Sequence, residues 1–268
     1  MAKAKHAQIP NQQHFTLPGD NDVTTKRSYY RRCTRYWRRT AKRLAKDGYR
    51  VFINYVNSAD VAEQLAEQIK ADGGSAFTVQ ADVRDDQQVQ AMFDFISTEH
   101  GGVDVLVSNA NMHFTAKPFT QQSWPEFSQK LNDELHASYV TAQLAVESML
   151  KKGFGRLVFI SSTLSEAPAP SFIAHGTAKG ALDSFSKYLA QELGPNGITS
   201  NIVAPGLVLT DATAEAPEEF KEMIRNFTPT QRIATPEDVA NTVSYLASEA
   251  SSHITGTYNP VCGGAYIQ

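Results

Sequence analysis

The stretch Arg156-Leu157-Val158-Phe159-Ile160-Ser161-Ser162 decides the fold of this chain. Its short apolar run is typical of a β-strand that is buried on both faces. A helical pattern follows from Ile173 to Leu193. A buried strand that leads into an amphipathic helix is the repeating unit of a parallel sheet with crossover helices.

The same alternation continues on both sides of this stretch, from Ala41 onward. We expect strands at Arg50–Asn54, Ala76–Gln80, Val103–Val107, Arg156–Ile160, Ile198–Val203 and Thr257–Pro260. We expect helices at Ala59–Ala71, Asp86–Glu99, Ser123–Leu150, Ile173–Leu193 and Pro236–Ser248. This order predicts a single α/β domain with a doubly wound parallel sheet, which binds ligands at the carboxyl ends of its strands.

Composition describes an ordinary soluble protein. The chain has 268 residues, 41% apolar residues and a net charge of -3, which suits one large domain. Its two cysteines lack metal-ligand or redox spacing, so we expect no metal and a cytoplasmic protein. No apolar run is long enough to cross a bilayer, and we expect the polar residues 1–25 to be disordered, with the domain spanning 26–268.

Three motifs are spaced along the second half of the chain. Ser161-Ser162 ends a strand, His175 and Lys179 lie four residues apart on the next helix, and Pro205-Gly206-Leu207-Val208-Leu209-Thr210 follows another strand. Together they resemble the short-chain dehydrogenase/reductase family over about Ala41 to Gln268, most closely its 3-oxoacyl and enoyl acyl-carrier reductases. The resemblance implies a Rossmann-like fold and a reaction in which a nicotinamide cofactor passes hydride to a carbonyl or enoyl substrate.

In that family the catalytic set is Ser, Tyr and Lys, and this chain matches it at Ser162 and Lys179. The tyrosine position is His175, and we expect Lys179 to favour its neutral, weakly acidic form. A second register, typical of enoyl reductases, places the tyrosine at Phe172 instead. The phenol is missing in either register, so His175 is either a replacement proton donor or a polar residue in a degraded site. Glu134 falls where the family has an asparagine that seats a relay water; we interpret it as an exposed helix carboxylate, with a water ligand as the alternative.

The resemblance also implies a set of cofactor-binding residues. Asn54 and Tyr55 end the first surviving strand without the acid that NAD(H) enzymes use, so NADP(H) is favoured over NAD(H). The expected contacts to the cofactor come from Asn54, Ser58, Asp82, Val83, Asn109, Ala110, Lys179, Pro205, Gly206, Val208 and Thr210.

The glycine-rich phosphate loop of the family is absent. Where it belongs, residues 26–43 contain nine Lys or Arg and no acid. Shifting the reading frame by one nucleotide through Arg27 to Thr40 permits Ala-Leu-Ile-Thr-Gly-Ala-Ala-Arg-Gly-Ile-Gly-Ala-Ala, which is the missing strand and loop. We therefore interpret residues up to about 40 as an out-of-frame translation and expect a degraded first strand. The alternative is a basic patch for nucleic acid or anionic membrane, which we consider unlikely for a chain of negative net charge.

The sequence thus predicts an NAD(P)H-dependent oxidoreductase that reduces a 3-oxoacyl-like carbonyl, impaired in this chain. The alternatives are an enoyl reductase of the same fold and a non-catalytic homologue that acts as a scaffold or partner subunit. We expect a small-molecule or acyl thioester substrate, a homodimer or homotetramer, and no membrane partner.

Overall fold

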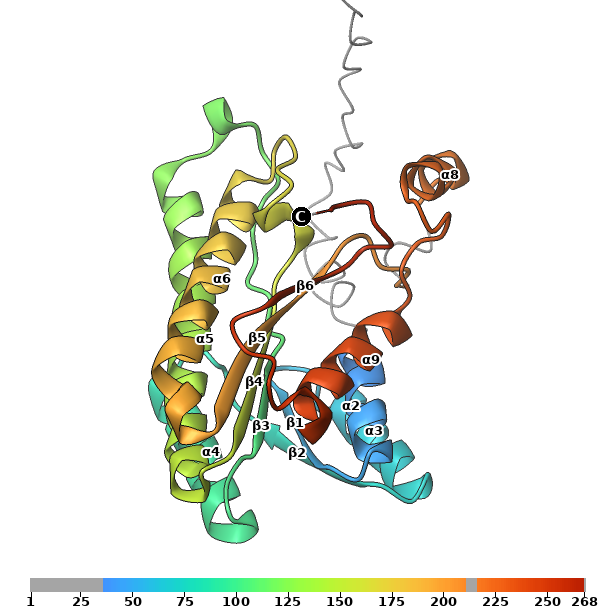
Figure 1. The fold of residues 1–268 in the computed structure, drawn as a ribbon. Coiled ribbons are helices and arrows are strands. Elements are labelled where there is room, and N and C mark those ends of the chain that lie inside the picture. Colours follow the sequence, from blue (N-terminus) through green and yellow to red (C-terminus); the bar gives the residue numbers. More distant parts are fainter. Residues whose placement is uncertain (1–35, 211–215, 268) are drawn as a thin grey trace, which may run out of the picture.

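A computed structural model describes residues 36–210 and 216–267 of the chain (Figure 1). In chain order the elements are α2 (Tyr36–Lys46), β1 (Arg50–Tyr55), α3 (Ala59–Ala71), β2 (Ser75–Gln80), α4 (Asp86–His100), β3 (Val105–Ser108), η2 (Phe119–Gln121), α5 (Trp124–Lys152), β4 (Gly155–Ile160), η3 (Thr163–Ser165), α6 (Ile173–Leu193), η4 (Gly194–Asn196), β5 (Ile198–Pro205), α8 (Glu218–Phe227), α9 (Pro236–Ala247), η5 (Glu249–Ser251) and β6 (Tyr258–Val261).

All strand pairs are parallel, as predicted. Strand β1 pairs with β2, and β3, β4, β5 and β6 pair in that order. Parallel strands end at one edge of a sheet, so the segments that follow them meet at that edge. The strand β4, whose sequence decides the fold, is buried along its whole length, and so is β5.

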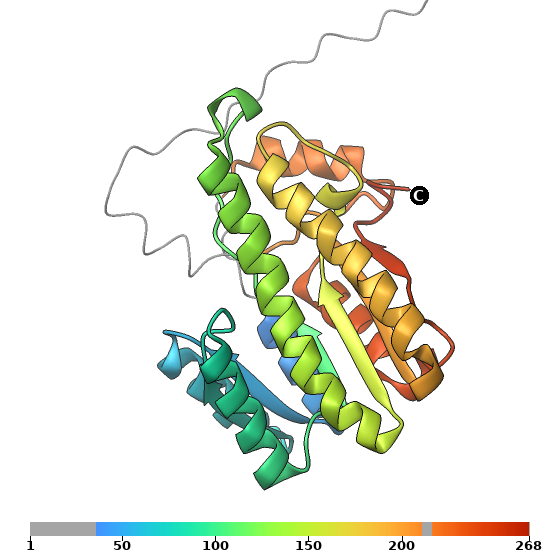
Figure 2. The ribbon, with the colours of Figure 1, turned by 90° about the vertical axis from the view of Figure 1, so that its left-hand side faces the viewer.

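Helices cover both faces of the strands (Figures 1 and 2). The helices α4, α5 and α6 share one apolar core with Leu157, Phe159 and Ile202. On the opposite face α9 packs against Val158 and Val203, and α2 and α3 pack around Ile53 of β1. Two helical layers around these parallel strands give the predicted single α/β domain.

Within the described residues the sheet is split between β1 and β3. The free edge of β1 has no strand partner there, and neither has that of β3. All residues of β3 are half-buried, although β4 beside it is fully buried. The first strand, which we expected to be degraded, would belong between these two edges, and that prediction concerns residues that the structure does not describe. Residues 26–35 lie outside the described part of the chain, as do residues 1–25.

Two helices were not predicted. We expected regular structure only from Ala41, but α2 begins at Tyr36 and buries Thr40, Ala41, Leu44 and Ala45 on one face. One of its basic residues forms an ion pair with α9: the Nε atom of Arg39 lies 2.9 Å from Oε1 of Glu237. The second helix, α8, lies between β5 and α9, where we expected no regular element.

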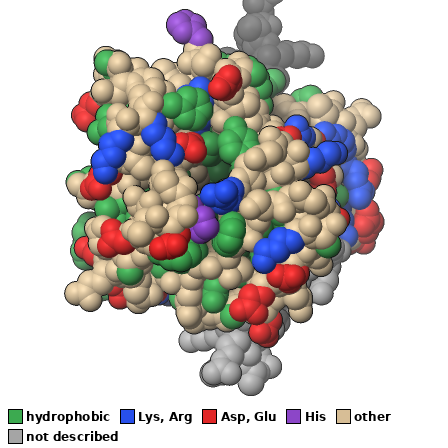
Figure 3. Space-filling view, turned by 90° about the horizontal axis from the view of Figure 1, so that it is seen from below, with side chains coloured by type: hydrophobic (Ala, Val, Ile, Leu, Met, Phe, Trp, Pro, Cys, Tyr) green, Lys and Arg blue, Asp and Glu red, His purple; other side chains and the backbone are tan. Residues whose placement is uncertain are grey.

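Charges of both signs are interspersed on the face opposite the carboxyl ends of the strands (Figure 3). Within residues 36–210 and 216–267, this face therefore offers no large basic patch for a nucleic acid. Among the described residues, no helix is long and apolar enough to cross a membrane.

Candidate active site

The end of β4 and the first half of α6 bring two predicted catalytic residues together. The buried Lys179 donates a hydrogen bond of 2.7 Å to the carbonyl oxygen of Ile160, the last residue of β4. Two residues further on, the hydroxyl of Ser162 accepts a hydrogen bond from the Leu164 amide at 3.2 Å and caps η3. Lys179 and Ser162 are therefore both anchored to the backbone at the carboxyl edge of the sheet.

A buried carboxylate also binds Lys179, and this contradicts one of our expectations. Glu134 of α5 is 1% exposed and forms an ion pair with the Lys179 ammonium. Its second oxygen lies 2.5 Å from the ammonium of Lys130, which is also buried. Glu134 is therefore not an exposed helix carboxylate, because α5 and α6 pack side by side and enclose it.

The pKa of Glu134 reflects this environment. Burial alone would raise it, but the ammoniums of Lys179 and Lys130 outweigh burial and lower the pKa to about 2. Burial lowers the pKa of Lys130 to about 8, although Glu134 opposes this change. The sequence signal for this pair was only a Lys and a Glu four residues apart, which usually indicates a solvated helix surface.

His175 lies in the predicted position but is nearly enclosed. It is 7% exposed, its ring stacks on Phe114 at a centroid distance of 4.6 Å, and its buried Nδ1 has no hydrogen-bond partner. Burial is the largest of the causes that lower the pKa of His175 to about 3, and the charges of Lys179 and Lys130 contribute to the same decrease. The expectation of a neutral imidazole is confirmed, but burial is a larger cause than Lys179.

No phenol replaces the missing one among the residues described around this site. Phe172 lies with its ring centroid 6.0 Å from that of Phe114. The phenol of Tyr258 on β6, which sequence reasoning missed, is bonded to the backbone at Ser162. It donates a 3.2 Å hydrogen bond to the Ser162 carbonyl oxygen, and burial raises its pKa to about 12. A phenol with such a raised pKa is a weak acid, so Tyr258 supports the backbone at Ser162.

The residues expected around the adenosine lie at the ends of β1 and β2. The amide of Asn54 donates to the Ala81 carbonyl oxygen at 2.9 Å, and Ser58 stands at the N-cap of α3 without a side-chain cap bond. Both carboxylate oxygens of Asp82 accept from the Arg84 guanidinium, at 2.9 and 2.6 Å. Hydrogen bonding to Arg84 lowers the pKa of Asp82. Asn54 and Asp82 therefore already have partners within the protein.

The side chain of Val83 is half-buried and packs against the apolar core that α4, α5 and α6 share. The other residues predicted to contact the cofactor lie at the ends of β3 and β5. Asn109 is half-buried and Ala110 is exposed in the turn after β3. After β5, Pro205 and Val208 are buried, and Gly206 and Thr210 are half-buried. A side chain at position 206 would approach the Cβ of Cys262 to 2.9 Å, so this close packing requires a glycine.

Comparison with known proteins agrees with this arrangement. The sequence profile of a family described as enoyl-(acyl carrier protein) reductase matches residues 38–266. The chain belongs to the short-chain dehydrogenase/reductase family. The 3-oxoacyl-[acyl-carrier-protein] reductase FabG of Staphylococcus aureus is 34% identical over 235 residues, which cover 86% of this chain and 93% of that protein. The 7alpha-hydroxysteroid dehydrogenase of Clostridium sardiniense is 33% identical over 231 residues, covering 85% of this chain and 87% of the relative.

Solved structures confirm the fold of this short-chain dehydrogenase/reductase. The crystal structure of a candidate gluconate dehydrogenase from Agrobacterium tumefaciens superposes with a TM-score of 0.81 at 26% identity, covering 87% of this chain and 92% of the other. The chain is thus an oxidoreductase of this family, similar to the 3-oxoacyl-[acyl-carrier-protein] reductases, in which the position expected for tyrosine is His175 and that expected for asparagine is Glu134.

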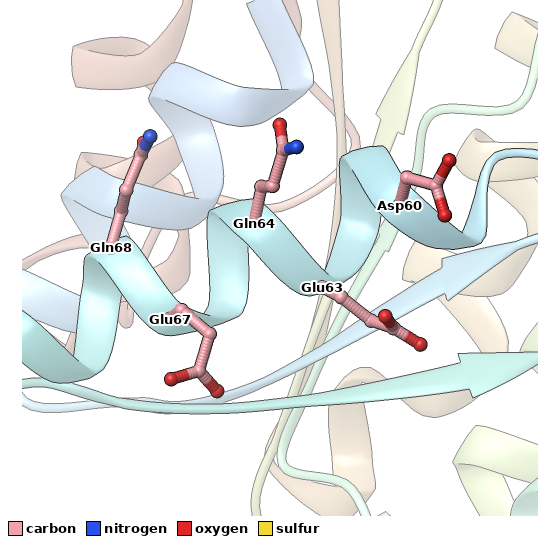
Figure 4. A pocket seen from close by; sticks show the side chains of 5 residues that line it. All are labelled: Asp60, Glu63, Gln64, Glu67 and Gln68. Atoms are coloured by element: carbon pink, nitrogen blue, oxygen red, sulfur yellow. The ribbon is translucent and has the colours of Figure 1, made fainter.

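A surface hollow elsewhere does not compete with this site. It lies along one face of α3 and is lined by Asp60, Glu63, Gln64, Glu67 and Gln68 (Figure 4). All of these side chains come from the exposed face of one helix, and Glu67 already pairs with Lys70 of the same helix at 3.1 Å. In the described part of the chain no group of His, Cys, Asp and Glu could hold a metal ion.

Proposed function

We propose that this chain is an NADP(H)-linked reductase of a 3-oxoacyl-like carbonyl whose nucleotide loop and proton donor are both impaired. One observation supports this proposal above all. The Lys179 ammonium of α6 donates a hydrogen bond to Ile160 at the end of β4, two residues before Ser162, so both side chains are anchored at the carboxyl edge of the sheet. Two relatives named 3-oxoacyl-[acyl-carrier-protein] reductase suggest an acyl thioester as the substrate.

The residues present fit the nicotinamide half of the cofactor. Two protons of the Lys179 ammonium are used by Ile160 and Glu134, which leaves one for a ribose hydroxyl. The backbone of Gly206 passes close to Cys262, and the segment to Thr210 would border the ring. When bound, NADP(H) supplies the hydride.

The residues present fit the pyrophosphate poorly. A helix N-terminus binds phosphate through free backbone amides that can approach it closely. Here α2 starts with Tyr36 and Trp37, whose large side chains pack against two parts of the core. We infer weak nucleotide binding by the chain as it stands.

The protein's own residues are suited to orienting the substrate and the nucleotide, but not to donating a proton. The hydroxyl of Ser162 would donate to the substrate oxygen and orient it. Lys179 would orient the nucleotide. His175 has a pKa of about 3, so at neutral pH it holds no imidazolium proton to give. The chemical weakness of the site is therefore proton donation and not substrate orientation.

The preference for NADP(H) is part of the proposal. No carboxylate ends β1, where an acid would bind the ribose hydroxyls of NAD(H). The Ser58 hydroxyl makes no cap bond to α3 and is available to a 2′-phosphate. Competition between NADPH and NADH in a binding assay tests this preference.

A two-step restoration tests the function. We expect that replacing residues 27–40 with the off-frame sequence recovers nucleotide binding with little turnover. Adding His175→Tyr should then raise the reduction of a 3-oxoacyl thioester by roughly two to four orders of magnitude, the scale of a positioned general acid. The matched control is Phe172→Tyr in the same background.

Each outcome selects one function. A gain from Phe172→Tyr on an enoyl thioester, and not from His175→Tyr, would favour the enoyl reductase that the matching family description names. No turnover with either tyrosine, despite nucleotide binding, would favour a non-catalytic homologue. Strong turnover before either tyrosine is added would mean that His175 is the working acid.

We also propose a homodimer or homotetramer built on α5 and α6. Tyr139 of α5 and Tyr188 of α6 are 52% and 68% exposed, and a subunit interface would cover such large side chains. Light scattering at micromolar concentration tests this, and a monomer would contradict it.

A further inference from the structure

A buried chain of alternating charges connects α5 to α6. The side chains of Lys130, Glu134 and Lys179 are 0%, 1% and 4% exposed. Charges removed from water persist only when partners and hydrogen bonds satisfy them. The cluster therefore imposes strict geometry on every residue within it.

Nearly every polar atom of the cluster has a partner. Lys130 donates to Glu134 Oε2 at 2.5 Å, to Asn111 Oδ1 at 2.8 Å and to the Met112 carbonyl oxygen at 2.8 Å, which uses all three of its protons. Glu134 Oε2 also accepts from the Met112 amide at 3.0 Å. The other oxygen, Oε1, accepts from Lys179. One Lys179 proton is left over, and the structure gives it no acceptor among the described residues.

These contacts join three separate parts of the site. Asn111 and Met112 belong to the turn after β3, Glu134 and Lys130 to α5, and Lys179 to α6. The Lys179 ammonium is at the same time bound to the end of β4. Lys130 thus ties the turn after β3 to the carboxylate that holds Lys179.

We propose that Glu134 and Lys130 are positioning residues for Lys179. Glu134 holds the ammonium at the end of β4 with its free proton available, and Lys130 fixes Glu134 to the turn after β3. The contribution to nucleotide binding rests on the function proposed above, but the coupling between the three side chains does not. Both residues act through Lys179.

Lys179 is surrounded by charges of both signs, so the proposal predicts the direction of the titration shift that each variant should cause. Glu134 and Lys130 face Lys179 from α5, and His175 and Asp183 lie near it on α6. His175 is neutral, and burial raises the pKa of Asp183. The cluster proper thus contains two ammoniums and one carboxylate, so removing the Glu134 carboxylate and removing the Lys179 ammonium should have opposite effects on the titration of Lys130.

The experiment follows the lysine ammonium signals of the full chain by ¹⁵N NMR as a function of pH, without nucleotide. Glu134→Gln should lower the pH at which Lys130 loses its proton by roughly two units or more, because a carboxylate in direct contact is lost. Lys179→Met should raise that pH by roughly one to two units, because the like charge on the other oxygen of Glu134 is removed. Lys179→Arg, which keeps the charge, is the matched control and should leave the Lys130 titration nearly unchanged.

A merely structural role would not produce opposite shifts. If Glu134→Gln and Lys179→Met move the Lys130 titration in the same direction, or if neither moves it, the proposal is wrong. If Glu134→Gln does not fold, the double variant Glu134→Gln/Lys179→Met contains one ammonium in place of two. Its Lys130 titration should then lie between those expected for the two single variants, and a value outside that range would overturn the proposal.

A second readout links the cluster to nucleotide binding. In the chain whose residues 27–40 are replaced, Glu134→Gln should weaken NADPH binding about tenfold, because the carboxylate no longer holds the Lys179 ammonium at the end of β4. If the replaced chain with native Glu134 does not bind NADPH, the proposed function fails while the NMR result stands. If it binds NADPH and Glu134→Gln leaves the affinity unchanged, the positioning role is refuted.

Discussion

Replacing Glu134 with Gln should change how the stability of this protein depends on acid. In the folded protein the pKa of Glu134 is about 2, against an ordinary value of 4.5. A carboxyl group whose pKa is depressed by folding stabilises the folded state above its unfolded pKa. That contribution is lost as the pH falls through the folded pKa. The window for Glu134 therefore runs from about pH 4.5 down to about pH 2.

The size of the effect follows from the same values. A difference of about 2.5 units corresponds to about 3 kcal/mol of stability at pH 7, since one unit is worth about 1.4 kcal/mol. About 2 kcal/mol of this is lost by pH 3. Glu134→Gln also leaves two ammoniums without a counter-charge, and breaking a buried pair in this way costs about 3 to 5 kcal/mol at pH 7.

Urea unfolding at pH 7 and pH 3, monitored by circular dichroism, measures both the cost of Glu134→Gln and how this cost depends on pH. The free energy of unfolding of the wild-type chain should exceed that of Glu134→Gln by several kcal/mol at pH 7, and the difference should shrink by about 2 kcal/mol at pH 3. Comparing the two chains cancels the contributions of other carboxylates. A difference that is the same at both pH values would refute the reasoning, because Glu134 would then not be ionised in a charged cluster.

Three further predictions concern stability, each measured by urea unfolding. The pKa of Lys130 is about 8 in the folded protein against 10.5 ordinarily, so the unfolded chain binds the proton more tightly between these values. The free energy of unfolding of the wild-type chain, minus that of Lys130→Met, should thus rise by about 2 kcal/mol from pH 8 to pH 10. A difference that does not change with pH would contradict this. Thr235→Ala removes the capping box that Thr235 forms with Asp238 at the start of α9, and should cost about 1 kcal/mol; no loss would mean that the cap is dispensable. Gly197 has a φ of +76° and a Cβ there would collide with the Gly153 carbonyl oxygen, so Gly197→Ala should cost more than about 1 kcal/mol. Gly194→Ala, at an open position with ordinary φ, is its control and should be nearly neutral.

Much of the fold was predictable because local signals agreed with the tertiary structure. The helices Ala59–Ala71 and Ile173–Leu193 have the predicted bounds, and the strands differ by at most two residues at either end. Short apolar runs between amphipathic helices leave few alternatives to a parallel sheet. The helix α2 was missed because its basic residues resemble a solvated segment, whereas its buried face is made of Thr, Ala and Leu side chains.

The candidate site was predictable where chain position alone determines it. Ser162 and Lys179 follow from the end of one strand and the first turns of one helix. The role of Glu134 was not predictable, because its partners come from α6 and from the turn after β3, and sequence spacing does not reveal such long-range packing. The low pKa of His175 was predicted in direction from Lys179, but its burial against Phe114 depends on a distant segment.

The central claim is that the chain retains the serine and lysine of a short-chain dehydrogenase/reductase but has lost the phosphate loop between residues 27 and 40. Isothermal titration calorimetry with NADPH tests it most directly, on the unmodified chain and on the chain whose residues 27–40 are replaced by the off-frame sequence. We predict no binding at micromolar NADPH for the first and micromolar binding for the second, because only glycines allow backbone amides at a helix N-terminus to approach the pyrophosphate. Micromolar binding by the unmodified chain would contradict the account.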